Sequence, residues 1–165
     1  MLNVKIKKLS ESSEIPQYAK HGDAGLDLTA TSREYDEHGN VCYGTGLAFE
    51  IPRGYVGLVF PRSSNAKKDL ILSNSVGVID SGYRGEVVFK FKPSERFSRC
   101  IDGKTINVEM AIDYDIGDRI GQIIIMPYPQ INFIEVGDLS SSDRGVGGFG
   151  STDPITAAIE GNSQC

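Results

Sequence analysis

Apolar side chains at every second position place the strongest constraint on the fold of this chain. In residues 86–92, Val87, Phe89 and Phe91 alternate with Glu86, Val88, Lys90 and Lys92. Successive side chains of a β-strand point to opposite faces, so this spacing predicts a strand with one buried face. The same period recurs in residues 3–8, 24–30 and 106–112. No long segment has helical spacing, and 19 glycines and 7 prolines supply turns, so we predict an all-β sandwich or barrel.

Length and charge narrow the class of protein further. A chain of 165 residues with 39% apolar content is long enough for one core. The formal net charge of -5 argues against a non-specific nucleic-acid binder, whose affinity would come from a basic surface. A polyanionic substrate would therefore need a few well-placed arginines and a divalent metal.

The cysteines and the N-terminal residues indicate the cellular setting. Cys42, Cys100 and Cys165 are widely spaced and form no C-x-x-C pair, so neither a disulfide framework nor a zinc site is expected. The N-terminus lacks the apolar segment of a signal peptide, and no apolar run reaches the roughly 20 residues of a membrane span. We expect a soluble intracellular protein, cytoplasmic or, in a eukaryote, nuclear, that has no membrane partner.

Residues 74–86 concentrate chemical groups at a turn. An apolar run at 76–79 enters a polar turn and leaves into the strand at 86–92, which predicts a β-hairpin. Asp80 and Tyr83 lie at its mouth. Three glycines would remove side chains where a ligand approaches the backbone: Gly77, Gly82 and Gly85. The hairpin could hold a flat ring by its main chain, although Asp80 could instead bond the amide two residues on.

Three other segments carry candidate groups. In residues 24–30, Leu26, Leu28 and Ala30 would face the core, so Asp27 would point toward solvent or a site. Residues 61–68 predict a short helical turn with a serine cap, which is either a surface turn or an anion site. Gln122 adjoins a run at 123–126 predicted to be buried on both faces, where an unsatisfied amide costs about 1–3 kcal/mol.

Two further patterns concern chain organisation. Residues 47–51 and 55–60 predict strands joined by a tight reversal at 52–54. From residue 137 the composition changes to Ser, Asp and Gly, which predicts a core at 1–136 and a flexible glycine-rich arm at 137–165. The arm contains G-x-G-x-x-G, but too little chain follows for a βαβ unit. One arginine and one phenylalanine could instead close this arm over a nucleotide.

Five of these segments, in order from residue 24 to 152, resemble the motifs of the trimeric dUTPases. They read Ala-Gly-Leu-Asp-Leu at 24–28, Pro-Arg-Ser-Ser at 61–64, Asn-x-x-Gly-x-Ile-Asp-x-x-Tyr-x-Gly at 74–85, Gly-Asp-Arg-x-x-Gln at 117–122 and Arg-Gly-Val-Gly-Gly-Phe-Gly-Ser-Thr at 144–152. Ser64 stands where the family more often has glycine. The resemblance implies a jelly-roll-like β-barrel of the β-clip type and a homotrimer with active sites at subunit interfaces. It also implies a swapped C-terminal arm.

The implied activity is hydrolysis of dUTP to dUMP and pyrophosphate, by in-line attack of water on the α-phosphorus with Mg²⁺ as cofactor. Asp80 would be the catalytic general base, and Asp27 and Gln122 would hold the metal through water. The resemblance assigns the uracil and deoxyribose to Asn74, Gly77, Val78, Ile79, Tyr83 and Phe149. It assigns the phosphates to Arg62, Ser63, Ser64, Gln122, Arg144, Gly147, Gly148, Gly150 and Ser151.

Two alternatives remain open at this point. A dCTP deaminase, or a bifunctional deaminase and dUTPase, has the same fold and accepts Ser64. That family resembles Asp-Pro-Gly with a glutamate ten residues after the aspartate, whereas this chain has Asp80, Ser81, Gly82 and then Lys90. The other alternative is a non-catalytic trimer that binds nucleotide or has a regulatory function.

Overall fold

The computed structural model describes residues 2–94 and 113–148, and the chain divides into two units, Met1–Gln130 and Ile131–Cys165. The division predicted at 136/137 stays a prediction. The strand predicted at 106–112 lies outside the described residues, as do three predicted site residues: Phe149, Gly150 and Ser151.

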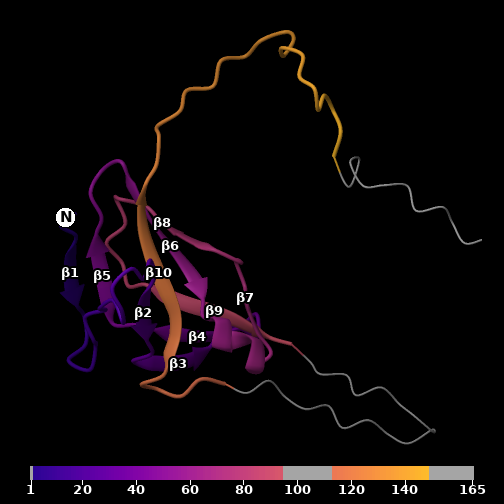
Figure 1. Cartoon of the computed structure of the whole chain (residues 1–165). Coiled ribbons are helices and arrows are strands. Elements are labelled where there is room, and N and C mark those ends of the chain that lie inside the picture. The colour runs from indigo at the N-terminus through magenta and orange to yellow at the C-terminus, as the bar shows by residue number, and fades with distance from the viewer. Residues whose placement is uncertain (1, 95–112, 149–165) are drawn as a thin grey trace, which may run out of the picture. The chain divides into compact units, whose positions relative to one another are not determined.

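The first unit is built from antiparallel β-strands (Figure 1). The strands are β1 (Lys5–Lys8), β2 (Leu26–Thr29), β3 (Ser32–Tyr35), β4 (Val41–Gly44), β5 (Leu47–Glu50), β6 (Tyr55–Pro61), β7 (Leu70–Leu72), β8 (Gly77–Ile79), β9 (Val88–Pro93) and β10 (Arg119–Pro127); one 3₁₀ helix, η1, covers Ser63–Lys67. Two four-stranded sheets have the orders β2-β10-β6-β8 and β3-β4-β9-β7, and β1 pairs with β5. The all-β prediction is confirmed.

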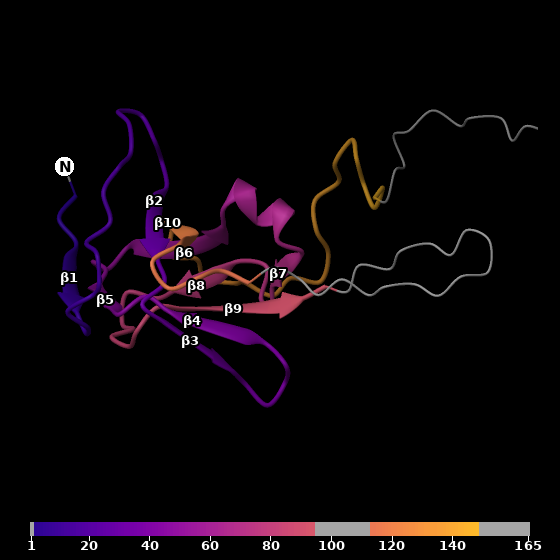
Figure 2. The ribbon, with the colours of Figure 1, turned by 90° about the horizontal axis from the view of Figure 1, so that it is seen from below.

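The core lies between the two four-stranded sheets, which Figure 2 shows one above the other. The alternation in residues 86–92 has the predicted effect, because Val87, Phe89 and Phe91 are buried. Gly121 of β10 brings the sheets together, since a methyl group there would lie 2.9 Å from Cδ1 of Phe89. Leu28 and Ala30 are likewise buried, as predicted.

One predicted strand pairing is wrong. The segments on either side of the turn at residues 80–87 do not form a hairpin, because β8 pairs with β6 whereas β9 pairs with β4 and β7. The chain therefore crosses from one sheet to the other at this turn. The strands predicted at 47–51 and 55–60 and the turn between them do form, and β5 pairs with β1 whereas β6 pairs with β10 and β8. Alternation determines which side chains are buried, whereas partners far along the chain determine the pairing.

The segment 123–126 is less buried than predicted. Ile123 is buried, but Ile124 and Ile125 are half-buried and Met126 is 44% exposed, so one face of β10 is partly open in this chain. In the described part of the chain, no helix has the length and apolar character to span a membrane. Cys42 is a buried free thiol.

Candidate functional site

Asp27 lines a pocket of about 460 Å³ at the β2 edge of its sheet. Its Oδ1 accepts a hydrogen bond from Nε of Arg62 at 2.9 Å, and its Oδ2 accepts one from Nη1 of Arg119 at 3.1 Å. Gln122 also lines the pocket. The structure therefore brings together three residues that the sequence placed in separate motifs, Asp27, Arg62 and Gln122.

Arg119 belongs to this pocket although it was not among the predicted site residues. In a regular strand, residues 119 and 122 would point to opposite faces. A β-bulge interrupts the pairing of β10 with β2 between Arg119 and Gly121, so that both Arg119 and Gln122 line the pocket. Period-two reasoning cannot find such a residue. The only available signal was its position within the fourth motif.

The Gln122 side chain is held by its surroundings. Its Nε2 donates a hydrogen bond to the Pro61 carbonyl at 3.2 Å. A methyl group on Gly25 would lie 3.2 Å from Cδ of Gln122 and still closer to Oε1. The glycine of the first motif thus leaves room for the glutamine of the fourth, and the predicted need of this amide for a partner is met by a backbone carbonyl.

The short helix after β6 differs in one respect from its prediction. Its N-cap is Arg62, and no side chain makes a capping hydrogen bond, so the predicted serine cap is wrong. Ser63 begins the helix and is exposed, and its side chain makes no hydrogen bond with any residue that the structure describes. The Tyr114 hydroxyl donates a hydrogen bond to Oδ1 of Asn65 at 3.1 Å, and burial is the largest cause that raises the pKa of Tyr114.

The turn that carries Asp80 begins at the end of β8. The amide of Tyr83 donates to the Asp80 carbonyl at 3.0 Å, which closes the turn. The Asp80 carboxylate is exposed and forms no hydrogen bond or ion pair with any described residue, so the alternative of a bond to the amide two residues on is not observed. This carboxylate is free to accept a hydrogen bond from water.

The glycines of this turn do not all serve the purpose predicted for them. A methyl group on Gly77 would meet Cγ2 of Val59 and lie 3.4 Å from Nδ2 of the Asn74 side chain. One on Gly85 would lie 2.6 Å from Cζ of Tyr83, whereas one on Gly82 would have no atom within 4 Å. Only Gly82, of the three, leaves open space for a ligand, since the other two accommodate side chains of the protein itself.

β8 has an open edge next to this turn. Among the described strands it is the last of its sheet and pairs only with β6, and Val78 is 61% exposed whereas Ile79 packs partly against the core. An edge strand presents unpaired backbone N–H and C=O groups. These groups can serve as donors and acceptors for a planar, base-like ligand.

The Asp27 pocket and the Asp80 turn are separate places in one chain. No residue from 74 to 83 lines the Asp27 pocket. Ser81 and Gly82 instead line a different hollow, of about 370 Å³, together with Asn3, Lys5 and Arg84. Within the described residues of one chain, the predicted catalytic base and the predicted metal and phosphate groups are therefore not assembled into one site.

In the second unit, Arg144 is exposed and folds back on its own turn. Its Nε donates to the Gly147 carbonyl at 3.0 Å, and the Gly147 amide donates to the Arg144 carbonyl at 3.1 Å. Gly145 has a φ of 53°, which favours glycine. Gly147 and Gly148 are half-exposed. The arm thus presents its arginine and its glycine backbone within one short segment.

The residues present suit a metal that keeps most of its own water. No group of three or more His, Cys, Asp or Glu side chains that could hold a metal ion is found among residues 2–94 and 113–148. Each oxygen of Asp27 accepts one arginine bond and retains acceptor capacity for a water. Mg²⁺ commonly retains several waters and binds through one or two carboxylates plus substrate phosphates. The donor set therefore fits Mg²⁺ bound through water.

Comparisons with known proteins agree on one family. The family model for dUTPase matches residues 11–153. Deoxyuridine 5'-triphosphate nucleotidohydrolase of Rhodococcus erythropolis is 39% identical over 155 residues, which cover 92% of this chain and 86% of that protein. The enzyme of the same name from Clostridium acetobutylicum is also 39% identical over 155 residues, covering 92% of this chain and 97% of that protein.

Solved structures give the same answer. The dUTPase of Staphylococcus bacteriophage 80alpha, solved with dUPNHPP, has a TM-score of 0.72 and 28% identity, covering 92% of this chain and 98% of that one. A mutant dUTPase from phage phi11 of S. aureus, described with a structural Mg(II) ion, has a TM-score of 0.62 and 27% identity, with 83% and 98% covered. The chain belongs to the dUTPase family.

Proposed function

We propose that this protein is a dUTP diphosphatase that hydrolyses dUTP to dUMP and pyrophosphate. The single observation that carries the mechanism is the Asp80 carboxylate, exposed at the end of an open-edged strand and without a partner among the described residues. A carboxylate so placed can orient a water and accept its proton as the water attacks the α-phosphorus. Such general-base assistance is typically about 10²- to 10⁴-fold in rate.

The open edge of β8 supports recognition of uracil. Backbone groups at Val78 and Ile79 would pair with the base, with Asn74 beside them near Gly77. Tyr83 is 45% exposed at the same turn, and its ring would pack against the deoxyribose. Phe149 of the arm is proposed to cover the base.

Phosphate groups would be bound by residues from two further segments. Arg62, Ser63, Ser64 and Gln122 would surround the triphosphate, and Arg144 with the glycine amides of the arm would neutralise charge on the leaving pyrophosphate. Bound Mg²⁺ would supply neutralisation of the phosphate oxygens. Asp27 and Gln122 would orient its waters. This proposal is supported by the acceptor atoms of both side chains and by their position in the same pocket.

The separation of the Asp27 pocket from the Asp80 turn supports a homotrimer in which different subunits complete each site. A second support is apolar surface. A groove of about 340 Å³ is lined by Leu2, Val4, Ile6 and other apolar residues beside β1. In the second unit, Ile131, Phe133, Ile134 and Leu139 are between 70% and 89% exposed. The second unit of one subunit would cover such a groove on another.

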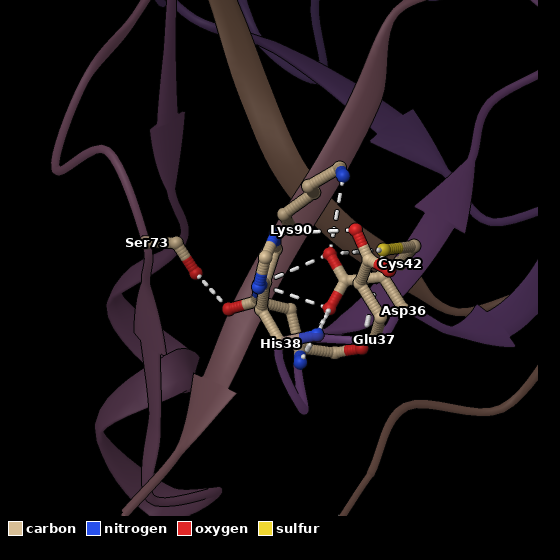
Figure 3. Close-up of polar contacts among 7 residues, drawn as sticks. Asp36, Glu37, His38, Cys42, Ser73 and Lys90 are labelled. Carbon is tan, nitrogen blue, oxygen red and sulfur yellow. Dashed lines mark hydrogen bonds and ion pairs between the residues drawn. The ribbon is translucent and has the colours of Figure 1, made fainter.

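The deaminase alternative has less support. Lys90 occupies the position where a deaminase would have its glutamate. It lies on β9 and forms an ion pair with Asp36 at 3.1 Å (Figure 3). A cation committed to an ion pair cannot take the place of a general base, so hydrolysis at the α-phosphorus is the better proposal.

The experiment measures pyrophosphate release with Mg²⁺ from dUTP, dCTP, dTTP and UTP in parallel, and ammonia from dCTP. Release from dUTP alone is expected. Ammonia from dCTP would favour the deaminase, and no product from any nucleotide would favour a binding protein.

Asp80→Asn tests the mechanism directly. The variant should bind a non-hydrolysable dUTP analogue but lose turnover, because an amide cannot accept the proton of the attacking water. Wild-type turnover in this variant would refute the proposed role of Asp80.

The arm is tested by truncation after Asp143. The shortened protein should remain folded and trimeric by sedimentation but lose most of its turnover, because Arg144 and the glycine amides are gone. Full activity after truncation would remove the arm from the mechanism.

A further inference from the structure

Tyr83 is 45% exposed, and its ring lies against its own turn. The Tyr83 hydroxyl donates a hydrogen bond to the Glu86 carbonyl at 3.0 Å. A methyl group on Gly85 would lie 2.6 Å from Cζ and 3.1 Å from Cε2 of the ring. The φ of Gly85 is outside the left-handed region, so the backbone does not require glycine here. The absence of a side chain at Gly85 leaves room for the Tyr83 ring.

The carbonyl that receives the Tyr83 hydroxyl is itself anchored. Oε1 of Glu86 accepts a hydrogen bond from the Gly46 amide at 2.6 Å. The next residue, Val87, accepts a bond from the buried hydroxyl of Thr45 at 2.7 Å and donates one to Leu47 at 2.9 Å. Residues 86 and 87 are therefore fixed to the connection between β4 and β5, and the Tyr83 ring is held against a rigid part of the fold.

We propose that Gly85 and Glu86 are positioning residues that set the preference for deoxyribose over ribose by holding Tyr83 in place. This inference rests on the proposed function, in which the ring meets the sugar. A ring pressed onto Gly85 occupies a defined volume at the sugar position. If the ring is pushed off Gly85, it no longer defines that volume, and both the fit to deoxyribose and the exclusion of a 2′-hydroxyl weaken.

The test compares kcat/KM for dUTP and UTP in the full-length protein with Mg²⁺. Gly85→Ala should lower the ratio of the dUTP value to the UTP value by about tenfold or more, because the added methyl displaces the ring. Gly82→Ala is the matched control in the same turn, where a methyl meets no atom within 4 Å. Whatever it does to turnover, its ratio should stay within about twofold of the wild-type ratio.

A second background separates this role from a general effect on folding. In Tyr83→Ala there is no ring to displace, so adding Gly85→Ala should leave the ratio and the thermal midpoint unchanged from those of Tyr83→Ala alone. The proposal is overturned if Gly85→Ala keeps the wild-type ratio, or if it lowers the ratio further without Tyr83. Absence of dUTP hydrolysis by the wild type would instead refute the proposed function.

Glu86 is tested by a conservative pair. Glu86→Gln retains an acceptor for the Gly46 amide and should retain the ratio, whereas Glu86→Ala should lower it. If Glu86→Ala keeps the wild-type ratio of the dUTP value to the UTP value, Glu86 does not help to position Tyr83.

Discussion

At the scale of single residues, Asp27 engages two guanidinium groups at once. Arg62 and Arg119 approach different oxygens of the carboxylate, so the plane of the carboxylate is defined by both. The Arg62 side chain is 27% exposed and the Arg119 side chain 57% exposed. The exposed ion pair of Arg119 with Asp27 adds little to stability. The value of the two ion pairs here is orientation, because the acceptor atoms left free on Asp27 face the pocket in a fixed direction.

Replacement of Arg119 by alanine should therefore separate activity from stability. We expect Arg119→Ala to lower kcat/KM for dUTP by about tenfold or more, since small misplacements of site groups are costly. The free energy of unfolding should change by less than about 1 kcal/mol. Lys92→Ala, which removes an exposed cation that lines neither the Asp27 pocket nor the hollow beside Ser81 and Gly82, is the control in both assays. Equal activities of the two variants would contradict the proposed effect on Asp27.

At the scale of elements, the connection between β3 and β4 is stabilised by one carboxylate. Asp36 accepts hydrogen bonds from the side chain and backbone of Asn40, from the amide of His38 and from Lys90 (Figure 3). The side chain of Asn40 contributes most to holding the pKa of Asp36 well below its usual range, and the Asn40 amide follows. Folding therefore favours the ionised form of this group.

The sign of the pH dependence follows from this lowered pKa. The contribution of Asp36 to stability is present above its unfolded pKa of about 3.9 and is lost as pH falls through the folded value. Asp36→Asn should be less stable than the wild type at pH 6, and the difference should shrink below about pH 4. Urea unfolding at several pH values measures this. Glu37→Gln changes the neighbouring residue, whose side chain is exposed, and is the control. Its difference in unfolding free energy from the wild type should not depend on pH in this way. If the difference for Asp36→Asn is the same at every pH, Asp36 does not have the proposed role.

Alternation along the strands predicts which side chains are buried, but it does not predict strand pairing or bulges. The burial of Phe89 and Phe91, and the outward direction of Asp27, follow from alternation alone and are confirmed. The hairpin prediction is wrong because β8 pairs with β6 and β9 pairs with β4. Strands that are neighbours in the sequence need not be neighbours in a sheet. Arg119 was missed because a single bulge changes the face to which a side chain points. The chemistry of the site was available from the motifs, whereas pairing and bulges depend on distant parts of the chain.

At the scale of the whole molecule, the central question is how Asp27 and Asp80 come to act on one substrate. Each has its own surroundings in the first unit, and among the described residues neither the Asp27 pocket nor the hollow beside Ser81 and Gly82 is lined by both. Assembly of several copies would solve this, because a symmetric oligomer brings different surfaces of identical chains together.

Mixed oligomers test this arrangement. Asp27→Ala and Asp80→Asn chains should each be inactive alone, yet co-expression should restore activity, since some sites would receive both native residues from different subunits. With random assembly of equal amounts, about a quarter of the sites would be complete. Activity no higher than that of the separate variants would show that one chain supplies both residues.

The turn from Asp80 to Val87 joins two sheets, and this limits how its length can vary. An inserted residue would have to be absorbed within the turn, because a shift of β9 by one position would turn Phe89 and Phe91 away from the core. Absorbing it within the turn would move Tyr83 away from Gly85 and the Glu86 carbonyl. An insertion or deletion would thus disturb either the packing of the core or the position of Tyr83. We therefore expect the number of residues between Asp80 and Phe89 to tolerate less change than the identity of any single residue in that segment.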